Sequence, residues 1–174
     1  MKLSIPVAQV VSNGTFAPMP ERSLVLDEFL PFRLSVTSNL VSDTIARTYQ
    51  AMFGLSIPEW RLVAVVAETG GVSQGAIGGR TRMDKVTVSR AAIALVERGL
   101  MQREGNPGDR RSHLLKLTAA GEELYAAVAP KALDLERRIF ESFSAQELDG
   151  FVAMLRRIDA AALSLEEPFS SPRT

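Results

Sequence analysis

The residues of this chain with the clearest potential for binding chemistry are basic and lie between Arg80 and Lys116. This segment holds nine Lys or Arg residues and four Asp or Glu residues, a net charge of +5 in a chain whose formal net charge is zero. A basic segment flanked by acidic sequence is typical of a module that binds a polyanion such as nucleic acid. On charge alone, a solvated surface with chance clustering explains the segment equally well.

Other chemistries lack the residues that they need. The chain has no cysteine, which excludes disulfide scaffolds, thiolate metal sites and thiol catalysis. His113 is the single histidine, so a histidine metal centre or a Ser–His hydrolase would depend on it alone. Glu122 and Glu123 are adjacent, and neighbouring side chains on a helix point about 100° apart, so they do not converge for acid–base catalysis. We therefore predict no enzymatic activity, no cofactor and no metal site.

Length and composition predict a folded, cytoplasmic protein. With 174 residues, 46% hydrophobic and 23% charged, the chain suits one ordinary domain with an attached dimerisation element. No apolar run approaches the roughly 18 residues of a membrane span, and the first residues lack the apolar core of a signal peptide. We expect no membrane partner.

Two short helices separated by a tight turn are predicted to position the basic residues. Ser73 can cap a helix over 74–82, and Asp84 can cap a second one from Lys85 to about Arg98. In the second helix the apolar residues form one stripe for the core, at i, i+3, i+4, i+7 and i+8: Val88, Ala91, Ala92, Leu95 and Val96. The first helix holds three glycines, each of which disfavours a helix by up to ~1 kcal/mol relative to alanine. That helix is therefore expected to be short, mobile or closely packed against backbone.

The second helix turns a face toward solvent that suits a DNA groove. Burying its apolar stripe leaves Val86, Thr87 and Arg90 outside, with Ser89 and Ile93 at the edge. Arginine can donate twice to a guanine edge, hydroxyls can bond bases or phosphates, and valine can contact a thymine methyl group. The alternative interpretation is an amphipathic surface helix with an exposed arginine.

A β-hairpin is predicted after the second helix, with two short strands around the turn Asn106–Asp109: Leu100–Arg103 and His113–Leu117. At its tip, Asp109 can hold the guanidinium of Arg110 or Arg111 in a bidentate pair while the other projects. A projecting arginine on a thin wing suits a narrow minor groove. A solvated ion pair at a loop tip is the alternative.

Helices are predicted on both sides of this unit. Ser56–Glu59 has the pattern of a capping box and opens a buried helix that ends before Gly70. A leading helix runs from Ser23 to about Met52, and Pro31 either delays its start to Phe32 or kinks it.

Helical periodicity returns after the hairpin, from Thr118, with a kink expected at Pro130. A second capping box at Ser144–Glu147 opens a last helix. We expect the apolar residues of this helix to face inward: Leu148, Phe151, Val152, Leu155 and Ile158.

The order of helix, short helix, turn, helix and hairpin is that of a winged helix-turn-helix. Five stretches at matching spacing together resemble the MarR family of bacterial transcriptional regulators: Asp84–Ala91, Val96–Leu100, Asp109–Arg111, Leu115–Thr118 and Gly121. The resemblance covers roughly residues 23–165. It implies a mainly α fold with a small β-hairpin wing, and a homodimer that binds a pseudo-palindromic site in double-stranded DNA.

The resemblance also implies a division of the chain and a set of DNA-binding residues. We expect an N-terminal arm (1–22), a helical dimerisation region (23–54 and 118–165), a winged helix-turn-helix lobe (55–117) and a flexible tail (166–174). By position, Arg111 would enter the minor groove with Asp109 orienting it, and Arg110 would serve phosphate. The residues expected to read or flank bases and phosphates are Ser73, Lys85, Val86, Thr87, Ser89 and Arg90.

A small aromatic or acidic effector that releases a repressor from DNA is a further implication of the resemblance. Such a ligand would bind where the dimerisation helices meet the DNA-binding lobe, and the candidate residues are Phe32, Arg33, Ser38, Asn39, Trp60 and Arg61. An arginine can hold a carboxylate and a tryptophan can stack on an apolar group. Alternatively, Trp60 is a core residue and the arginines are paired with acidic residues.

Two other functions compete with DNA binding. A nucleotide-binding enzyme is disfavoured because the glycines from Gly70 to Gly79 have neither the G-x-G-x-x-G spacing nor a Gly-Lys-Ser/Thr ending. A helical protein-interaction module without specific DNA binding stays open, although the +5 segment speaks against it.

Overall fold

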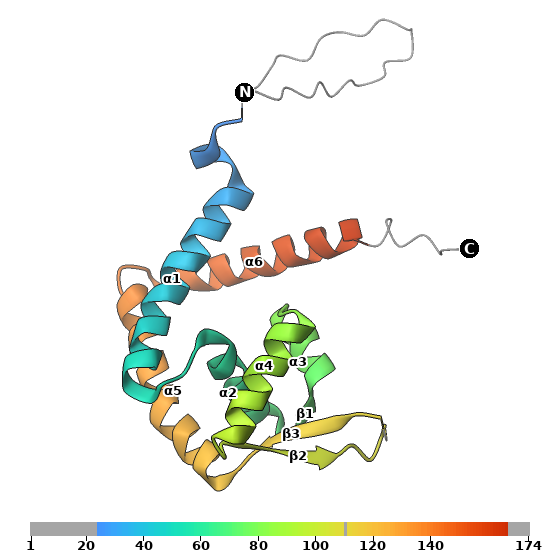
Figure 1. The fold of residues 1–174 in the computed structure, drawn as a ribbon. Helices are drawn as coiled ribbons and strands as arrows, with labels where there is room; N and C mark the ends of the chain where they lie inside the picture. Colours follow the sequence, from blue (N-terminus) through green and yellow to red (C-terminus); the bar gives the residue numbers. More distant parts are fainter. Residues whose placement is uncertain (1–23, 110, 167–174) are drawn as a thin grey trace, which may run out of the picture. The chain divides into compact units, whose positions relative to one another are not determined.

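The computed structural model describes residues 24–109 and 111–166, which fall into two compact units divided between Asp43 and Thr44. The predicted arm, the end of the predicted tail and Arg110 lie outside the described residues. Figure 1 shows the elements in chain order: η1 (Leu26–Glu28), α1 (Leu30–Phe53), α2 (Ile57–Thr69), β1 (Val72–Ser73), α3 (Gln74–Thr81), α4 (Lys85–Glu97), β2 (Met101–Gly105), β3 (His113–Leu117), α5 (Ala119–Ile139) and α6 (Ala145–Glu166).

Helix α2 forms the centre of the core. Its predicted capping box is confirmed, since Ser56 and Glu59 exchange side-chain and main-chain hydrogen bonds and a proline sits in the first turn. Four of its apolar side chains are buried: Leu62, Val63, Val65 and Val66. Gly70 ends the helix in the left-handed conformation. A helix that is apolar nearly all round must be covered on all sides, which places α2 between α4, α5 and the sheet.

Helices α3 and α4 form the predicted helix-turn-helix. Ser73 Oγ accepts the Ala76 N–H at the start of α3, as predicted for its cap. Of the three glycines in α3, Gly78 is the closely packed one, because an added Cβ would lie 3.2 Å from the Met83 carbonyl oxygen. Arg82 ends α3 in the left-handed conformation, with φ 55°. Glycine is the usual residue in this conformation, so the sequence does not predict it at Arg82.

The sheet has three antiparallel strands in the order β1-β3-β2, one strand more than predicted. The hairpin of β2 and β3 is confirmed, and the base of the hairpin is in the core, where Met101 pairs with Leu117 and is buried. The additional strand β1 has two residues, with Val72 opposite Leu115. A two-residue strand has no periodicity, so only its pairing with β3 reveals it.

Helix α1 starts at Leu30, two residues before the predicted Phe32, because Pro31 is tolerated in the first turn, where its missing N–H has no partner to lose. Gly54, with φ 60°, follows the last residue of α1. Helix α5 continues through Pro130 as one helix to Ile139. The structure thus places both ends of α1 within a few residues of their predicted positions.

The last helix, α6, differs from the prediction in what covers its apolar face. The Ser144–Glu147 capping box is confirmed, with Ser144 N–H donating to Glu147 Oε2 at 2.8 Å. The prediction of five inward residues is wrong for the single chain. Leu148 and Leu155 are half-buried, whereas three others are 39–43% exposed: Phe151, Val152 and Ile158. Periodicity determines which side chains share a face and not whether the same chain covers it.

Candidate nucleic-acid interface

The outer face of α4 carries the side chains predicted to meet DNA. The stripe of Val88, Ala91, Ala92 and Leu95 is buried against the core. On the opposite side Val86 is 57% exposed and Arg90 is exposed, while Thr87 and Ser89 are half-buried at the edge. The face therefore offers one guanidinium, one apolar contact and two hydroxyls, the groups that a major-groove reader needs.

The N-terminus of α4 is fixed by Asp84. Its Oδ1 accepts the N–H groups of Val86 and Thr87, both at 2.9 Å, and its Oδ2 accepts the Thr87 hydroxyl at 2.6 Å. These bonds, that of the Thr87 hydroxyl first, lower the pKa of the Asp84 carboxyl below its ordinary value. The Thr87 hydroxyl has its hydrogen engaged by the cap and presents lone pairs outward, so it can accept a hydrogen bond.

Several cations of the basic segment are used within the protein. Arg80 pairs with Glu68, and Lys116 Nζ lies 2.7 Å from Glu104 Oε2 across the β2–β3 ladder. The Lys116 bond lowers the pKa of the Glu104 carboxyl. Arg98 bonds to main-chain carbonyls at the end of α1.

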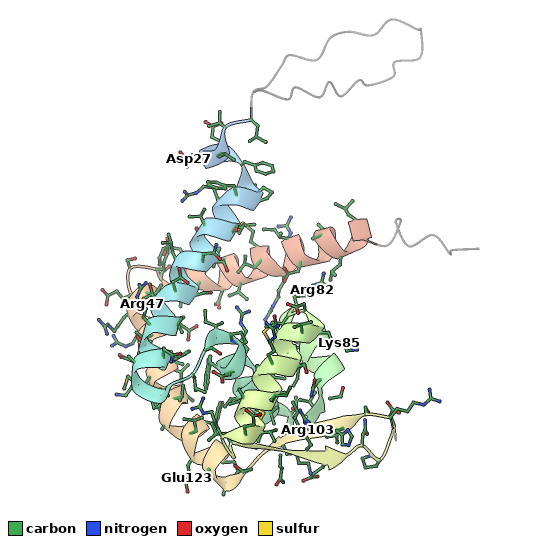
Figure 2. The ribbon with its side chains drawn as sticks, viewed as in Figure 1. Asp27, Arg47, Arg82, Lys85, Arg103 and Glu123 are labelled. Atoms are coloured by element: carbon green, nitrogen blue, oxygen red, sulfur yellow. The ribbon has the colours of Figure 1, made fainter. Side chains whose placement is uncertain are left out.

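Four exposed cations of the segment from Arg80 to Lys116 have no hydrogen bond or ion pair from their side chains within the described residues: Lys85, Arg90, Arg103 and Arg111. Figure 2 labels two of them, Lys85 at the start of α4 and Arg103 on β2. The net charge of the segment is therefore concentrated, as available positive charge, on α4 and the hairpin. Arg103 is exposed although the register pairs it with the buried Leu115 on the same face of the sheet, so strand alternation in the sequence does not indicate its exposure.

The tip of the hairpin is held by hydrogen bonds of the Asn106 and Asp109 side chains. Asn106 Oδ1 accepts the Gly108 N–H at 3.0 Å, and Asn106 Nδ2 donates to Ser112 Oγ at 2.8 Å. Asp109 Oδ1 accepts the main-chain N–H of Arg111 at 2.9 Å. Within the described residues Asp109 forms no ion pair with the Arg111 guanidinium, and Arg110, the other arginine predicted as its partner, lies outside them. Asp109 thus orders the backbone that carries Arg111.

The comparison with known protein families agrees with this geometry. A family model described as MarR family matches residues 53–112, the stretch from the end of α1 through the hairpin. Over this stretch the chain is similar to the MarR family of transcriptional regulators. Among its relatives, the transcriptional regulator HosA of Escherichia coli O157:H7 is 27% identical over 113 residues, which span 65% of this chain and 84% of HosA.

Solved structures of MarR-family regulators share the fold. Sco3205 of Streptomyces coelicolor, a MarR family regulator solved in complex with DNA, is 22% identical with a TM-score of 0.72, over 80% of this chain and 90% of its own. The PcaV regulator of Streptomyces coelicolor, solved with its natural ligand, is 22% identical with a TM-score of 0.66, over 81% of this chain and 99% of its own. At these identities the likeness establishes the winged helix fold.

The other predicted site residues differ in burial and in hydrogen bonding. Ser73 is half-buried and its oxygen caps α3, so only its hydroxyl hydrogen is available to a phosphate. Trp60 packs between two tyrosines, with ring centroids 5.2 Å from Tyr49 and 5.9 Å from Tyr125, as its core alternative expected. Arg61 is exposed and has no partner within the described residues.

The other four ligand candidates lie in the first unit, on α1. Phe32 is half-buried, Ser38 and Asn39 are exposed, and Arg33 Nη1 lies 3.9 Å from Asp27 Oδ1. Two hollows in the second unit are lined by other residues. One of about 240 Å³ is lined by Val66, Ala67, Gly70, Lys116, Leu117, Glu122 and Tyr125. The other, of about 270 Å³, is lined by Thr44, Leu135, Arg138, Ile139 and Glu141.

Neither a metal cluster nor a membrane span is found in the described part of the chain. No group of three or more His, Asp or Glu residues there could hold a metal ion. No described helix combines the length and apolar character needed to cross a bilayer.

Proposed function

We propose that this protein is a homodimeric repressor of the MarR family that reads a pseudo-palindromic DNA site and is released from it by a small-molecule effector. The observation that carries the DNA-binding part is the outer face of α4, where Arg90 and Val86 are exposed beside an apolar stripe that is fully used by the core. The MarR-family regulator Sco3205, which shares the fold, is known in a complex with DNA.

In this proposal each part of the lobe has one role on the duplex. Arg90, Val86, Thr87 and Ser89 read base edges from the major groove. Arg111 enters the adjacent minor groove, where a narrow groove concentrates negative potential, on a backbone that Asp109 orders. Phosphate contacts come from the N-terminus of α4, and from the side chains of Lys85, Ser73 and Arg110.

A second copy of the chain is proposed to cover the apolar face of α6, with 23–54 and 118–165 as the dimerisation region. The large exposed apolar side chains of α6 are Phe151, Val152, Met154, Ile158, Leu163 and Leu165. A continuous apolar face of this kind on a protein in water favours burial, at about 25 cal/mol for each Å² covered. A twofold dimer presents two copies of α4, as a site of two half-sites about 34 Å apart requires.

The dimer is tested by the mass of the protein in solution. Phe151→Glu together with Ile158→Glu should raise the dimer dissociation constant at least about tenfold, because two carboxylates would be buried unpaired. By helical periodicity Arg157 lies on the opposite face of α6, so Arg157→Glu is the matched control and should leave the dimer intact. Sedimentation equilibrium measures both. A double variant that stays as dimeric as the control would exclude this face.

The effector is proposed to act by a population shift. A ligand that favours a different spacing of the two lobes weakens DNA binding by its differential affinity for that state. PcaV, which shares the fold, is known with its natural ligand. The candidate contacts are the six residues predicted above, of which Arg61 offers an exposed guanidinium for a carboxylate. A panel of aromatic and acidic metabolites should include one that both raises the thermal midpoint and lowers DNA affinity.

The first experiment on the DNA-binding function is fluorescence anisotropy with the upstream intergenic duplex and a scrambled duplex, across a salt series. Sequence-dependent binding whose log affinity falls linearly with log salt supports phosphate neutralisation together with base readout. Binding that is absent or indifferent to sequence at modest salt would favour the helical protein-interaction module instead. Transcription from the upstream promoter with and without the protein then distinguishes a repressor from an activator.

A further inference from the structure

We propose that Arg98 is a positioning residue that fixes the direction of α4 relative to the end of α1, and thereby the spacing of the two α4 helices in the dimer. The inference rests on the DNA-binding function proposed above. It assigns to Arg98 no contact with DNA.

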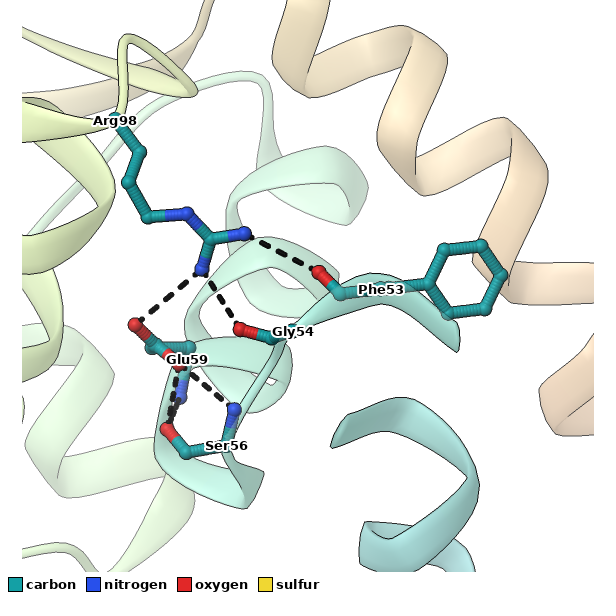
Figure 3. A network of polar contacts seen from close by, with 5 residues as sticks. All are labelled: Phe53, Gly54, Ser56, Glu59 and Arg98. Carbon is teal, nitrogen blue, oxygen red and sulfur yellow. Dashed lines mark hydrogen bonds and ion pairs between the residues drawn. The ribbon is translucent and has the colours of Figure 1, made fainter. Parts of the chain in front are cut away.

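Arg98 is the residue that follows α4, and its side chain reaches the far end of another helix. Its Nη1 donates to the Gly54 carbonyl at 3.0 Å and its Nη2 donates to the Phe53 carbonyl at 3.2 Å, as Figure 3 shows. These partners are 44 and 45 positions away in the sequence. One guanidinium therefore connects the end of α4 to the last residue of α1.

The two carbonyls are ones that α1 leaves without intrahelical partners. Phe53 ends α1, and Gly54 follows it with φ 60° and donates its N–H back to the Gln50 carbonyl. The last carbonyls of a helix point along its axis and carry partial negative charge, so a cation there is favourable. The direction of α1 sets the direction of these two carbonyls. The planar guanidinium of Arg98, which bonds to both of them, is oriented by α1 in turn.

Glu59 provides the third contact and brings in the start of α2. Its Oε1 lies 3.6 Å from Arg98 Nη1, while its Oε2 accepts the Ser56 N–H at 2.7 Å and the Ser56 hydroxyl at 2.8 Å. The Glu59 side chain is 13% exposed. One carboxylate thus closes the capping box of α2 with one oxygen and faces Arg98 with the other (Figure 3).

The opposite side of the same turn is attached to α5 in a different way. The Thr118 hydroxyl donates to the Gly99 carbonyl at 2.6 Å, and the Thr118 N–H donates to the Leu100 carbonyl at 3.2 Å. A side chain at Gly121 would overlap the Leu100 carbonyl oxygen, so α5 and this turn are in direct backbone contact. That attachment is rigid, because close-packed backbone has no room to move.

The end of α4 therefore has one rigid attachment, to α5, and one attachment through a single side chain, to the end of α1. The Arg98 side chain is 38% exposed, so water can take the place of its partners. Its loss leaves the core intact, since the buried residues of α4 lie further back, at Val88, Ala91, Ala92 and Leu95. What changes is how tightly the direction of α4 is held relative to the end of α1, which lies in the region proposed for dimerisation.

A duplex with two half-sites distinguishes positioning from every local role. Both α4 helices of a dimer must fit at once, whereas one lobe on a single half-site can adjust its direction freely. Loss of the Arg98 bridge should therefore weaken binding to two correctly spaced half-sites and leave a single half-site unaffected. A phosphate contact by Arg98 would instead weaken both duplexes and lower the salt dependence.

The test uses full-length Arg98→Met, which keeps the apolar stem, with Arg157→Met as a control that removes an exposed arginine without a side-chain partner in the described residues, from the face of α6 opposite the apolar one. The half-sites in the upstream duplex are first located by footprinting with the wild-type protein. The probes are this duplex with both half-sites, the same duplex with one half-site scrambled, and versions in which the distance between the half-sites is changed by one base pair. We expect Arg98→Met to lose about tenfold in affinity on the first probe, from charge-assisted hydrogen bonds. We expect less than about twofold on the second probe, and weaker discrimination among spacings.

Glu59→Gln provides a second variant if Arg98→Met is unfolded by circular dichroism. A glutamine can keep the capping box while removing the negative charge that faces Arg98, and we expect the same pattern with a smaller loss, about threefold. Equal losses on one and two half-sites, or no loss beyond that of Arg157→Met, would overturn the inference. If the wild-type protein shows no preference for the upstream duplex, the proposed function fails, and the inference fails with it.

Discussion

Replacement of Arg90 by alanine is the most direct perturbation of base readout. Arg90 is exposed on α4, and its side chain has no hydrogen bond or ion pair within the described residues. Its removal should therefore change the free energy of unfolding by no more than about 0.5 kcal/mol, as for an ordinary surface substitution. Any larger effect of Arg90→Ala must then appear in the free energy of DNA binding.

The size of that effect follows from the chemistry of the side chain. A bidentate arginine–guanine pair contributes about 1–3 kcal/mol of discrimination. A dimer loses two such pairs, so Arg90→Ala should weaken binding to the upstream duplex at least about 30-fold, if the two half-sites contribute independently. On a scrambled duplex the loss should be much smaller, since only the long-range attraction of one charge per subunit disappears.

Fluorescence anisotropy at one fixed salt concentration measures both duplexes. Arg157→Ala is the matched control, since it removes an exposed arginine without a side-chain partner in the described residues from the face of α6 opposite the apolar one, and it should cost less than about twofold. Equal losses for Arg90→Ala on the specific and scrambled duplexes would refute base readout by Arg90 and leave it a phosphate contact.

Three further predictions concern the parts that hold this face in place. Gly121→Ala should lower the free energy of unfolding by about 1–3 kcal/mol, because its Cβ would overlap the Leu100 carbonyl. Gly150→Ala, where nothing lies within 4 Å, should raise the free energy of unfolding by about 0.5–1 kcal/mol. Urea titrations in which Gly121→Ala is the more stable variant would contradict the close contact between α5 and Leu100. Asp84→Ala should lower the thermal midpoint at neutral pH. Because folding lowers the pKa of Asp84, the stability that its carboxylate contributes is present above the ordinary aspartate pKa of about 3.9 and is lost as pH falls through the folded pKa. The melting temperatures of variant and wild type should therefore converge in acid. Arg103→Ala should reduce the slope of log affinity against log salt by about 0.9 for each phosphate that is no longer neutralised, with sequence preference unchanged; an unchanged slope would remove Arg103 from the interface.

Much of the winged helix lobe and the start of α6 could be predicted, because their determinants are local in sequence. The capping boxes at Ser56 and Ser144 and the cap at Asp84 involve partners two or three positions away. The apolar stripe of α4 and the turn between β2 and β3 are likewise contained in a dozen residues. Such signals are short-range hydrogen bonds and helical periodicity, which act in any tertiary context.

What could not be predicted depends on partners that are distant in sequence. The strand β1 exists only because Val72 meets Leu115, and the apolar face of α6 could not be distinguished from a buried one by its period. The wing carboxylate of Asp109 accepts the backbone N–H of Arg111, and no pair with the Arg111 guanidinium is found in the described residues; spacing does not decide between these two donors.

The charge of the segment from Arg80 to Lys116 shows most clearly where sequence ends and structure begins. The sequence by itself determined that this segment is basic and that it folds as a helix-turn-helix with a hairpin, since composition and local patterns suffice for both. The tertiary structure decided which cations are available, by pairing Arg98 with the end of α1 and Lys116 with Glu104 while leaving Arg90 and Arg111 to solvent. Ion pairs and hydrogen bonds form between groups that the fold brings within about 3 Å of each other. The separation of two residues in the sequence does not determine that distance.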